Sequence, residues 1–194
     1  MYSSQNIQND IVVKLYQDKR TVFKISDIAL LTEDNHPTSL ARRLNYYVKT
    51  GKILNPRKGI YSKPEYNSAE LASKLYTPSY ISLQYVLQRA GIIFQYSETI
   101  TTMSYLSREV EVDGQTFTYR KAKQQILYNW AGVIQSEQGI FQATPERAFL
   151  DLCYLESGFY FDNLNPLDRN LISELLAVYS SSTLSLRVKK ILES

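Results

Sequence analysis

The stretch PTSLARRLNYYVKTGKILNPRKGIYSK, residues 37–63, decides the fold expected for the first part of this 194-residue chain. It contains seven lysine and arginine residues and no aspartate or glutamate. Surface helices usually mix both signs of charge, because opposite charges three or four positions apart attract each other. A stretch of one sign therefore favours a phosphate-bearing partner, and a plain solvated helix face is the alternative interpretation.

The first half of this stretch has the pattern of an amphipathic helix. Apolar residues, among them Leu40 and Leu44, recur at helical spacing and fall on one side. Pro37 suits the first turn of a helix, where its missing N–H has no intrahelical partner, and Gly51 suits the position just past the end. A helix is therefore predicted for residues 37–50.

The second half predicts a small β-hairpin with a basic tip. The runs KILNP and GIYSK are rich in apolar and aromatic residues and meet at a turn over residues 56–59. A helix followed by such a ribbon is the end of a winged helix-turn-helix, whose helix enters the major groove while the ribbon tip lies against the DNA backbone. The candidate DNA-binding residues are Thr38, Ser39, Arg42, Arg43, Tyr46, Lys49, Arg57 and Lys58.

The residues before this stretch complete a predicted DNA-binding domain, residues 1–64. Ser26 is expected to cap a short helix, and Asp27 would then lie near the positive end of that helix. The predicted elements are a helix at 7–16, a strand at 21–23, a helix at 27–31 and a turn at 32–36.

Residues 65–194 predict a second domain, with a small, mainly antiparallel sheet and several helices, so the fold class is α+β. Its strongest local signal is the alternation EVEVDGQTFTY around Asp113-Gly114, which is typical of a two-residue hairpin. Thr144 and Pro145 are the expected N-cap and first residue of another helix. The other predicted helices are 68–75, 80–90 with Ser79 as its cap, 171–179 and 183–192, and the other predicted strands are 99–105, 125–133 and 139–144.

The net charge is distributed unevenly along the chain. The whole chain carries +3. Up to Lys63, eleven Lys and Arg against five Asp and Glu give +6, and in the remainder eleven against fourteen give −3. The N-terminal part is therefore the part suited to nucleic acid.

Several functional classes are excluded by the residues that the sequence lacks. With one cysteine, Cys153, and one histidine, His36, neither an intramolecular disulfide nor a zinc site of Cys and His ligands is possible. Cys153 is expected in the core. No motif for a phosphate-binding loop, a nucleophile elbow or zinc-dependent hydrolysis occurs. The sequence therefore predicts no enzyme, no catalytic residue, no cofactor and no metal site.

A cytoplasmic location is expected, without a membrane partner. The first ten residues lack the charged start and apolar run of a secretory signal. No run of eighteen apolar residues occurs anywhere in the sequence.

One group of carboxylates leaves a remote alternative. Glu109, Glu111 and Asp113 are expected on one face of a strand, followed by Arg120 and Lys121 after the return strand. Carboxylates beside a lysine could bind Mg²⁺ for phosphodiester cleavage, as in a nuclease. Charged residues on the wet face of a hairpin explain the same pattern.

Three segments together resemble the AbiEi antitoxins of type IV toxin-antitoxin systems. They are SLARRLNYYVKTGKILNPRKGIYSKP (39–64), LYTPSYISLQYVLQRAGII (75–93) and ATPERAFLDLCYL (143–155), in the order and spacing of that family. The resemblance implies a bacterial protein whose N-terminal domain binds double-stranded DNA at inverted repeats and represses its own operon. It also implies a C-terminal domain that counteracts a nucleotidyltransferase toxin.

A second interpretation is a stand-alone winged-helix transcription regulator, in which the C-terminal domain binds a ligand or another protein. The sequence leaves open which of the two interpretations holds, as well as the operator sequence and the oligomeric state.

Overall fold

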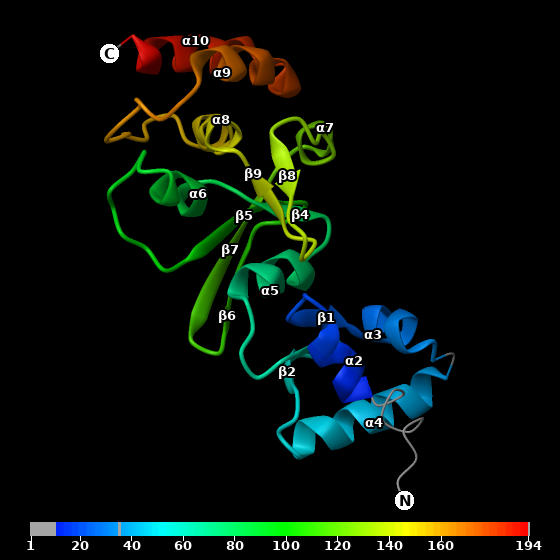
Figure 1. The fold of residues 1–194 in the computed structure, drawn as a ribbon. Helices are drawn as coiled ribbons and strands as arrows, with labels where there is room; N and C mark the ends of the chain where they lie inside the picture. Colours follow the sequence, from blue (N-terminus) through cyan, green and yellow to red (C-terminus); the bar gives the residue numbers. More distant parts are fainter. Residues whose placement is uncertain (1–10, 35, 194) are drawn as a thin grey trace, which may run out of the picture. The chain divides into compact units, whose positions relative to one another are not determined.

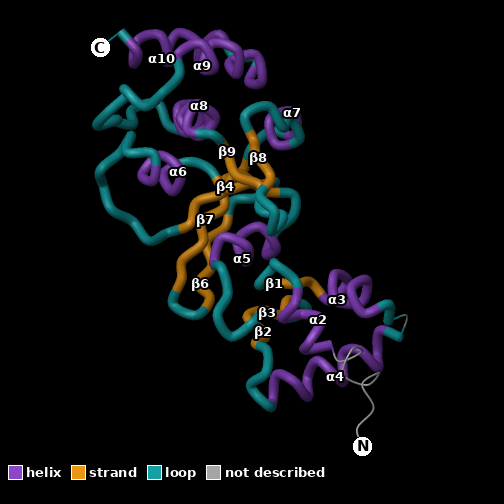
Figure 2. Tube along the Cα trace, viewed as in Figure 1, coloured by secondary structure: helices purple, strands orange, loops and turns teal. Residues whose placement is uncertain are grey.

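A computed structural model describes residues 11–34 and 36–193 of the chain (Figures 1 and 2). These residues form two compact units. The N-terminal unit comprises the described residues up to Leu75 together with Glu137–Gly139, and the C-terminal unit comprises Tyr76–Ser136 and the residues from Ile140 onward. Both units contain helices and strands, so the predicted α+β class is confirmed.

The N-terminal unit contains a three-stranded sheet of order β1-β3-β2, in which both pairings are antiparallel. The predicted long helix, the hairpin after it and the helix at 68–75 are confirmed. Residues 7–10 of the predicted first helix, and Asn35 of the predicted turn, lie outside the described residues. The elements are α2 (Ile11–Gln17), β1 (Val22–Lys24), α3 (Ile25–Thr32), α4 (Pro37–Lys49), β2 (Leu54–Arg57), β3 (Ile60–Ser62) and α5 (Ser68–Leu75).

The apolar side of α4 packs into the core of the N-terminal unit. Leu40 and Leu44 are almost fully buried, as their helical spacing predicted. Removing this apolar surface from water is the main favourable contribution to folding. The buried cluster consists of Ile11, Leu15, Phe23, Ile28, Leu40, Leu44, Ile53 and Tyr61.

Helix α3 begins earlier than predicted, because Asp27 acts in place of Ser26 at the N-terminus. The Lys24 N–H donates to Oδ2 of Asp27 at 2.9 Å, and Lys24 is the N-cap residue. The predicted cap at Ser26 is therefore wrong, and Ser26 lies inside the helix. The helix ends at Thr32, and its C-cap residue Glu33 has a left-handed conformation with φ of 56°.

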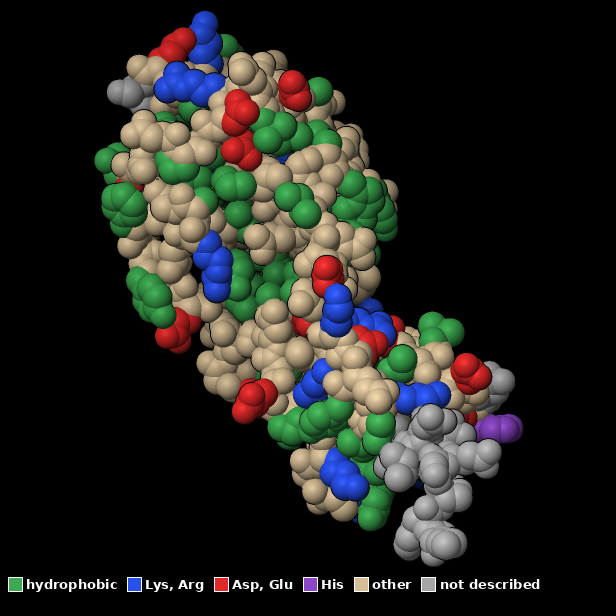
Figure 3. Space-filling view, in the orientation of Figure 1, with side chains coloured by type: hydrophobic (Ala, Val, Ile, Leu, Met, Phe, Trp, Pro, Cys, Tyr) green, Lys and Arg blue, Asp and Glu red, His purple; other side chains and the backbone are tan. Residues whose placement is uncertain are grey.

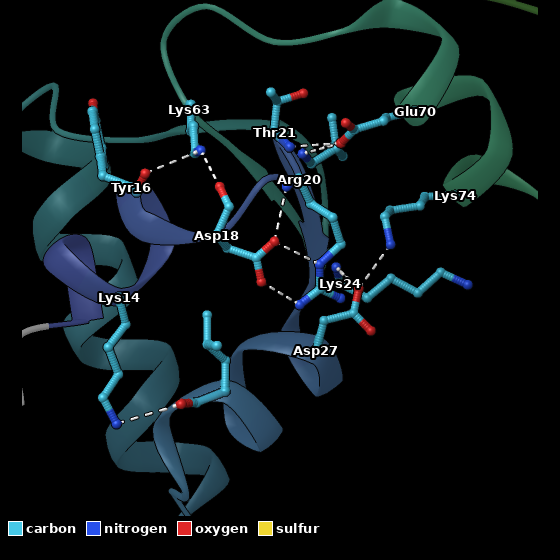
Figure 4. Close-up of polar contacts among 12 residues, drawn as sticks. Lys14, Tyr16, Asp18, Arg20, Thr21, Lys24, Asp27, Lys63, Glu70 and Lys74 are labelled. Carbon is cyan, nitrogen blue, oxygen red and sulfur yellow. Dashed lines mark hydrogen bonds and ion pairs between the residues drawn. The ribbon is translucent and has the colours of Figure 1, made fainter. Parts of the chain in front are cut away.

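Helix α5 is part of the N-terminal unit through a network of polar contacts (Figure 4). The buried Glu70 carboxylate accepts hydrogen bonds from the backbone N–H groups of Thr21, at 2.7 Å, and Val22, at 2.8 Å. Lys74 donates to Oδ2 of Asp27 at 2.9 Å. These contacts attach α5 to the start of β1 and to the first turn of α3.

The C-terminal unit is built on a six-stranded sheet of order β6-β7-β5-β4-β9-β8. Three of its pairings are antiparallel, whereas β5 with β7 and β4 with β9 are parallel, so the sheet is mixed where a small, mainly antiparallel one was predicted. The strands are β4 (Ser79–Ile81), β5 (Ile100–Ser104), β6 (Arg108–Val112), β7 (Gln115–Lys121), β8 (Val133–Gln135) and β9 (Phe141–Ala143). The helices are α6 (Gln84–Arg89), α7 (Gln124–Leu127), α8 (Pro145–Leu155), α9 (Arg169–Leu175), the 3₁₀ helix η1 (Leu176–Tyr179) and α10 (Ser182–Leu192).

The sequence predicted elements of this unit correctly where turn-forming or helix-capping residues mark their ends. The β6–β7 hairpin turns at Asp113 and Gly114, both with positive φ, as predicted. Thr144 is the N-cap of α8, and its hydroxyl accepts from the Arg147 N–H at 3.2 Å.

Two predictions in this unit are wrong. Ser79 was expected to cap a helix over residues 80–90, but it begins the buried strand β4, and α6 covers only part of that range. The strand predicted at 125–133 is replaced by the short helix α7, a loop and the first residue of β8. Short apolar runs suit either structure, and pairing with distant strands decides between them.

Helix α8 lies at the centre of the helical part of the C-terminal unit, between α6 and the pair α9 and α10 (Figure 1). Its Arg147 and Asp151 are fully buried and form an ion pair at 3.4 Å. Asp151 also accepts hydrogen bonds from Tyr179 at 2.7 Å, Ser82 at 2.7 Å and Tyr80 at 3.1 Å. Burial raises the pKa of Asp151, and the Arg147 charge and the hydroxyl donors oppose that rise. The cluster connects α8 with the chain around β4 and with η1.

No helix within residues 11–34 and 36–193 combines the length and apolar character that crossing a lipid bilayer requires.

Candidate nucleic-acid interface

The outward side of α4 displays the helix residues that the sequence singled out. Thr38, Ser39, Arg42, Tyr46 and Lys49 are all exposed, because Leu40 and Leu44 direct the opposite side into the core. Tyr46 keeps 61% of its surface exposed, which is high for an aromatic residue. One helix face therefore presents two hydroxyls, a phenol and two cations.

The N-terminal turn of this face adds backbone donors. The first N–H groups of a helix have no intrahelical acceptor, and the helix dipole makes that end favourable for anions. Pro37 occupies the first helical position, and Thr38 and Ser39 follow it. A phosphate approaching this end of the 13-residue helix would find N–H and hydroxyl donors together.

Arg42 and Arg43 are neighbours with different surroundings. Arg43 forms an ion pair with Asp34, whose side chain is only 9% exposed. Oδ1 of Asp34 also accepts the His36 N–H at 2.8 Å, and the Asp34 N–H donates to the Ala29 carbonyl at 3.0 Å. Arg43 is thus bound to the turn between α3 and α4, whereas Arg42 has no ion-pair partner within the described ranges.

The β2–β3 hairpin is held by an amide side chain. Nδ2 of Asn55 donates to the carbonyls of Arg57, at 2.9 Å, and Ile60, at 2.7 Å. The register shifts between Leu54 and Arg57, where Pro56 has no N–H to donate to the ladder. Arg57 ends β2 and is half-buried.

The tip of this hairpin is narrower than the four residues predicted. It consists of Lys58 and Gly59, and Lys58 is exposed. Gly59 has φ of +80°, a conformation that L residues with side chains rarely adopt. The exposed cation of the hairpin is therefore carried on a tight two-residue turn.

Two further cations of the basic stretch make contacts inside the N-terminal unit. Lys52 lies over the ring of Tyr47, with Nζ 5.6 Å from its centre. Lys63 donates to the Asp18 carbonyl at 2.7 Å, just after the C-terminal end of α2 (Figure 4). Both positions favour a structural role.

Arg42, Lys49 and Lys58 are the cations of the predicted site that are exposed and lack an ion-pair partner in the described part of the chain. In the space-filling view, Lys and Arg side chains reach the surface over the N-terminal unit (Figure 3). The contribution of Asp34 was missed by sequence reasoning, because that residue lies just outside the acid-free stretch. Asp34 lies just before the predicted helix, and that position could have identified it as a turn-forming residue.

The carboxylates considered for Mg²⁺ binding lie on and just after the edge strand β6. Glu109 and Glu111 are exposed, and Thr118 donates to Glu109 at 3.3 Å. Within residues 11–34 and 36–193, no group of three His, Cys, Asp or Glu side chains is arranged to hold a metal ion.

Comparison with known proteins gives a likeness of fold. No protein-family model and no curated protein matches the chain. The crystal structure of the RV2827C protein from Mycobacterium tuberculosis is similar, with a TM-score of 0.54 at 14% sequence identity. The match covers 97% of this chain and 76% of that one. At this level of identity the chain shares the fold, over nearly its whole length, with that mycobacterial protein.

Proposed function

We propose that the chain is a transcription regulator that binds double-stranded DNA through a winged helix-turn-helix in its N-terminal unit. The order helix, strand, helix, helix and two-stranded ribbon is the order of that motif. Helix α4 would then enter the major groove, and the β2–β3 hairpin would be the wing on the sugar-phosphate backbone.

The exposed face of α4 is the observation that carries this proposal. Arg42 and Lys49 are exposed on it and have no carboxylate partner among the described residues, and Tyr46 lies between them. Thr38, Ser39 and Arg42 are proposed to contact bases or phosphates. Lys49 and the wing residues Arg57 and Lys58 are proposed to contact the backbone.

Fluorescence anisotropy with the full-length protein tests the proposal. The probes are a duplex carrying the inverted repeat nearest the chain's own gene and a shuffled duplex of equal length. Two chains on an inverted repeat would bring six unpaired cations, so log affinity should fall against log salt with a slope of about −5. A slope near zero, or equal affinity for both duplexes, would contradict the proposal.

Two variants distinguish contacts with the bases from contacts with the sugar-phosphate backbone. Arg42→Ala should lose most of the preference for the inverted repeat, because a bidentate arginine contact discriminates between bases by about 1–3 kcal/mol. Lys58→Ala should weaken both duplexes by similar factors, because a phosphate contact carries no sequence information. Negligible effects from both would place the binding surface elsewhere.

The antitoxin role is a second proposal, supported by the AbiEi-like segments at 39–64, 75–93 and 143–155. In this proposal the protein acts in the cytoplasm, performs no catalysis and counteracts a nucleotidyltransferase toxin. Coexpression with a neighbouring nucleotidyltransferase gene tests it: the chain should restore growth. Growth arrest that the chain leaves unchanged would favour the stand-alone regulator.

A further inference from the structure

A pocket of about 300 Å³ opens in the C-terminal unit between the sheet, α6 and the loop from α6 to β5. The loop is drawn in teal in Figure 2. This volume lies at the small end of the ~300–1,000 Å³ typical of ligand sites. None of the residues that line it belongs to the proposed DNA interface.

One wall of the pocket comes from the loop between α6 and β5. Ile93, Gln95 and Ser97 line the pocket. Phe94 and Tyr96, which alternate with them, are 67% and 75% exposed. This wall therefore contributes one apolar and two polar side chains to the pocket, whereas the two aromatic side chains lie in solvent.

Hydrogen bonds fix this wall in place before any ligand binds. The Phe94 N–H donates to Oδ2 of Asp162 at 2.8 Å, and the Ser97 N–H donates to the side chain of Gln88 at 3.2 Å. The Gln115 side chain donates to the Glu98 carbonyl at 2.6 Å. A preformed wall lowers the ordering cost of binding.

The sheet supplies the floor and the single charged group. Thr101 on β5 and Thr118 on β7 are directly paired in the sheet, so both lie on the face that Arg120 also shares. Arg120 donates through Nη1 to Glu156 at 2.8 Å. A guanidinium has five N–H donors, so most of them remain available to a ligand.

Part of the polar lining is free and part is engaged: the hydroxyls of Ser97, Thr101 and Thr118 all take part in hydrogen bonds within the unit. The side-chain amides of Gln84 and Gln95 and the hydroxyl of Thr99 make no hydrogen bond to a described residue, and all three residues line the pocket. Arg120 is the charged residue of the lining, and its ion-pair partner Glu156 does not itself line the pocket. This set of donors suits oxygen-rich ligands with one negative charge.

We propose that this pocket binds a small organic anion. Arg120 contacts its carboxylate or phosphate group, and the amides of Gln84 and Gln95 contact its neutral polar groups. This binding is independent of the proposed DNA interface, since none of the interface residues lines the pocket.

NMR titration of the ¹⁵N-labelled full-length chain tests this inference. Glycerol 3-phosphate and glycerate are the phosphate and carboxylate probes, glycerol is the neutral control, and the ionic strength is kept constant. At least one anion should shift the side-chain amide signals of Gln84 and Gln95 in a saturable way, and glycerol should not. Absence of saturable shifts with both anions would overturn the inference.

Substitutions locate the site. Arg120→Gln should weaken the responding anion about tenfold or more, because a charge-assisted contact is lost. Gln84→Leu leaves the Arg120–Glu156 ion pair intact and should also weaken binding, so it decides the matter if Arg120→Gln does not fold. Arg89→Gln is the matched control, since Arg89 stacks 3.7 Å from the Tyr85 ring centre and does not line the pocket. Binding by Gln84→Leu equal to wild type, together with unchanged binding by any folded Arg120→Gln, would contradict the inference.

Discussion

Arg42 and Arg43 follow each other on α4, and only Arg43 has a carboxylate partner among the described residues. An arginine that is already paired releases few counterions from DNA, whereas a free one releases about one. The two residues are chemically identical and adjacent in sequence, so neither property distinguishes their expected roles. The Asp34 carboxylate does, because it binds Arg43 and the turn before the helix at once.

We expect Arg42→Ala to reduce the salt slope of DNA binding by about one and Arg43→Ala to leave that slope nearly unchanged. Arg43→Ala should instead lower affinity through a misplaced α4. Anisotropy titrations across a salt series provide the measurement. Asp34→Ala should act like Arg43→Ala, and the double variant should cost little more than either single one. Equal slope changes for Arg42→Ala and Arg43→Ala would refute this assignment.

Two ion pairs among the described residues have the same i,i+4 spacing and opposite surroundings. Arg147 and Asp151 are fully buried, whereas Lys189 and Glu193 keep 71% and 64% of their side chains exposed. Breaking a buried pair leaves an uncompensated charge without water, whereas an exposed pair is screened.

Asp151→Asn should therefore lower the free energy of unfolding of the C-terminal unit by about 3–5 kcal/mol. Glu193→Gln, as the matched change in the exposed pair, should alter it by less than about 0.5 kcal/mol. Urea unfolding followed by circular dichroism compares the two. A loss as small for Asp151→Asn as for Glu193→Gln would mean that the buried cluster does not stabilise the fold.

At the scale of elements, α5 completes the N-terminal unit through one buried carboxylate. Glu70 accepts the N–H groups of Thr21 and Val22 and is 1% exposed. Glu70→Ala would leave both donors without a partner, and we expect a loss of about 2–4 kcal/mol of stability. Native-state hydrogen exchange at the Thr21 and Val22 amides measures it. Glu65→Ala, at an exposed position, is the control and should leave the exchange unchanged.

The β2–β3 hairpin depends on one backbone conformation. A Cβ at Gly59 would meet no atom within 4 Å, so the cost of Gly59→Ala comes from its φ of +80° alone. We expect a destabilisation of about 1–2 kcal/mol, measured by thermal unfolding. Gly158→Ala is the control, since Gly158 lies in equally open space without a left-handed φ. A Gly59→Ala variant as stable as Gly158→Ala would show that the turn relaxes without strain.

Elements whose start and end are marked chemically were predictable from sequence. Helix α4 has Pro37 at its start, Gly51 just past its end and one apolar side between them, so its bounds were predicted closely. The strand β4 was mistaken for helix, because its neighbours β5 and β9 are distant in sequence and local periodicity does not report them.

At the scale of the whole molecule, the uneven distribution of charge was visible in the sequence. Which of the cations are exposed and unpaired was not. The count of seven cations treated all of them alike, whereas the structure binds Arg43, Lys52 and Lys63 into internal contacts. The identity of the exposed cations depends on where side chains from other elements come to lie. The exposed helix face was predicted, and the neutralising role of Asp34 was not.

The N-terminal unit should lose stability in acid. The side-chain hydrogen bond from Arg20 lowers the pKa of Asp18 below its ordinary value of 3.8. Burial acts to raise the pKa of Asp27, but the hydrogen bonds from the Lys24 backbone and the Lys74 side chain outweigh it. The pKa of Asp27 is therefore lowered as well. A lowered pKa in the folded state means stability that is present above the ordinary pKa and is lost as the pH falls through the folded value.

Urea unfolding between pH 6 and pH 2 checks this expectation. The wild type should lose stability as the pH falls below about 4. Asp18→Asn should be less stable at neutral pH and should show a flatter dependence on pH in acid. Glu65→Gln is the exposed control and should follow the wild type. An Asp18→Asn profile parallel to wild type throughout this range would contradict the assignment.

The two sides of α4 have consequences for engineering. Leu40, Leu44 and Arg43 hold the helix in its unit, whereas Thr38, Arg42 and Tyr46 contribute little to that packing. Under the proposed function, the outer positions are the ones to rewrite in order to retarget the protein to a new operator, with Leu40, Leu44, Arg43 and Asp34 retained. Under the same proposal, libraries that randomise Arg43 along with Arg42 are expected to lose folded members without gaining specificities.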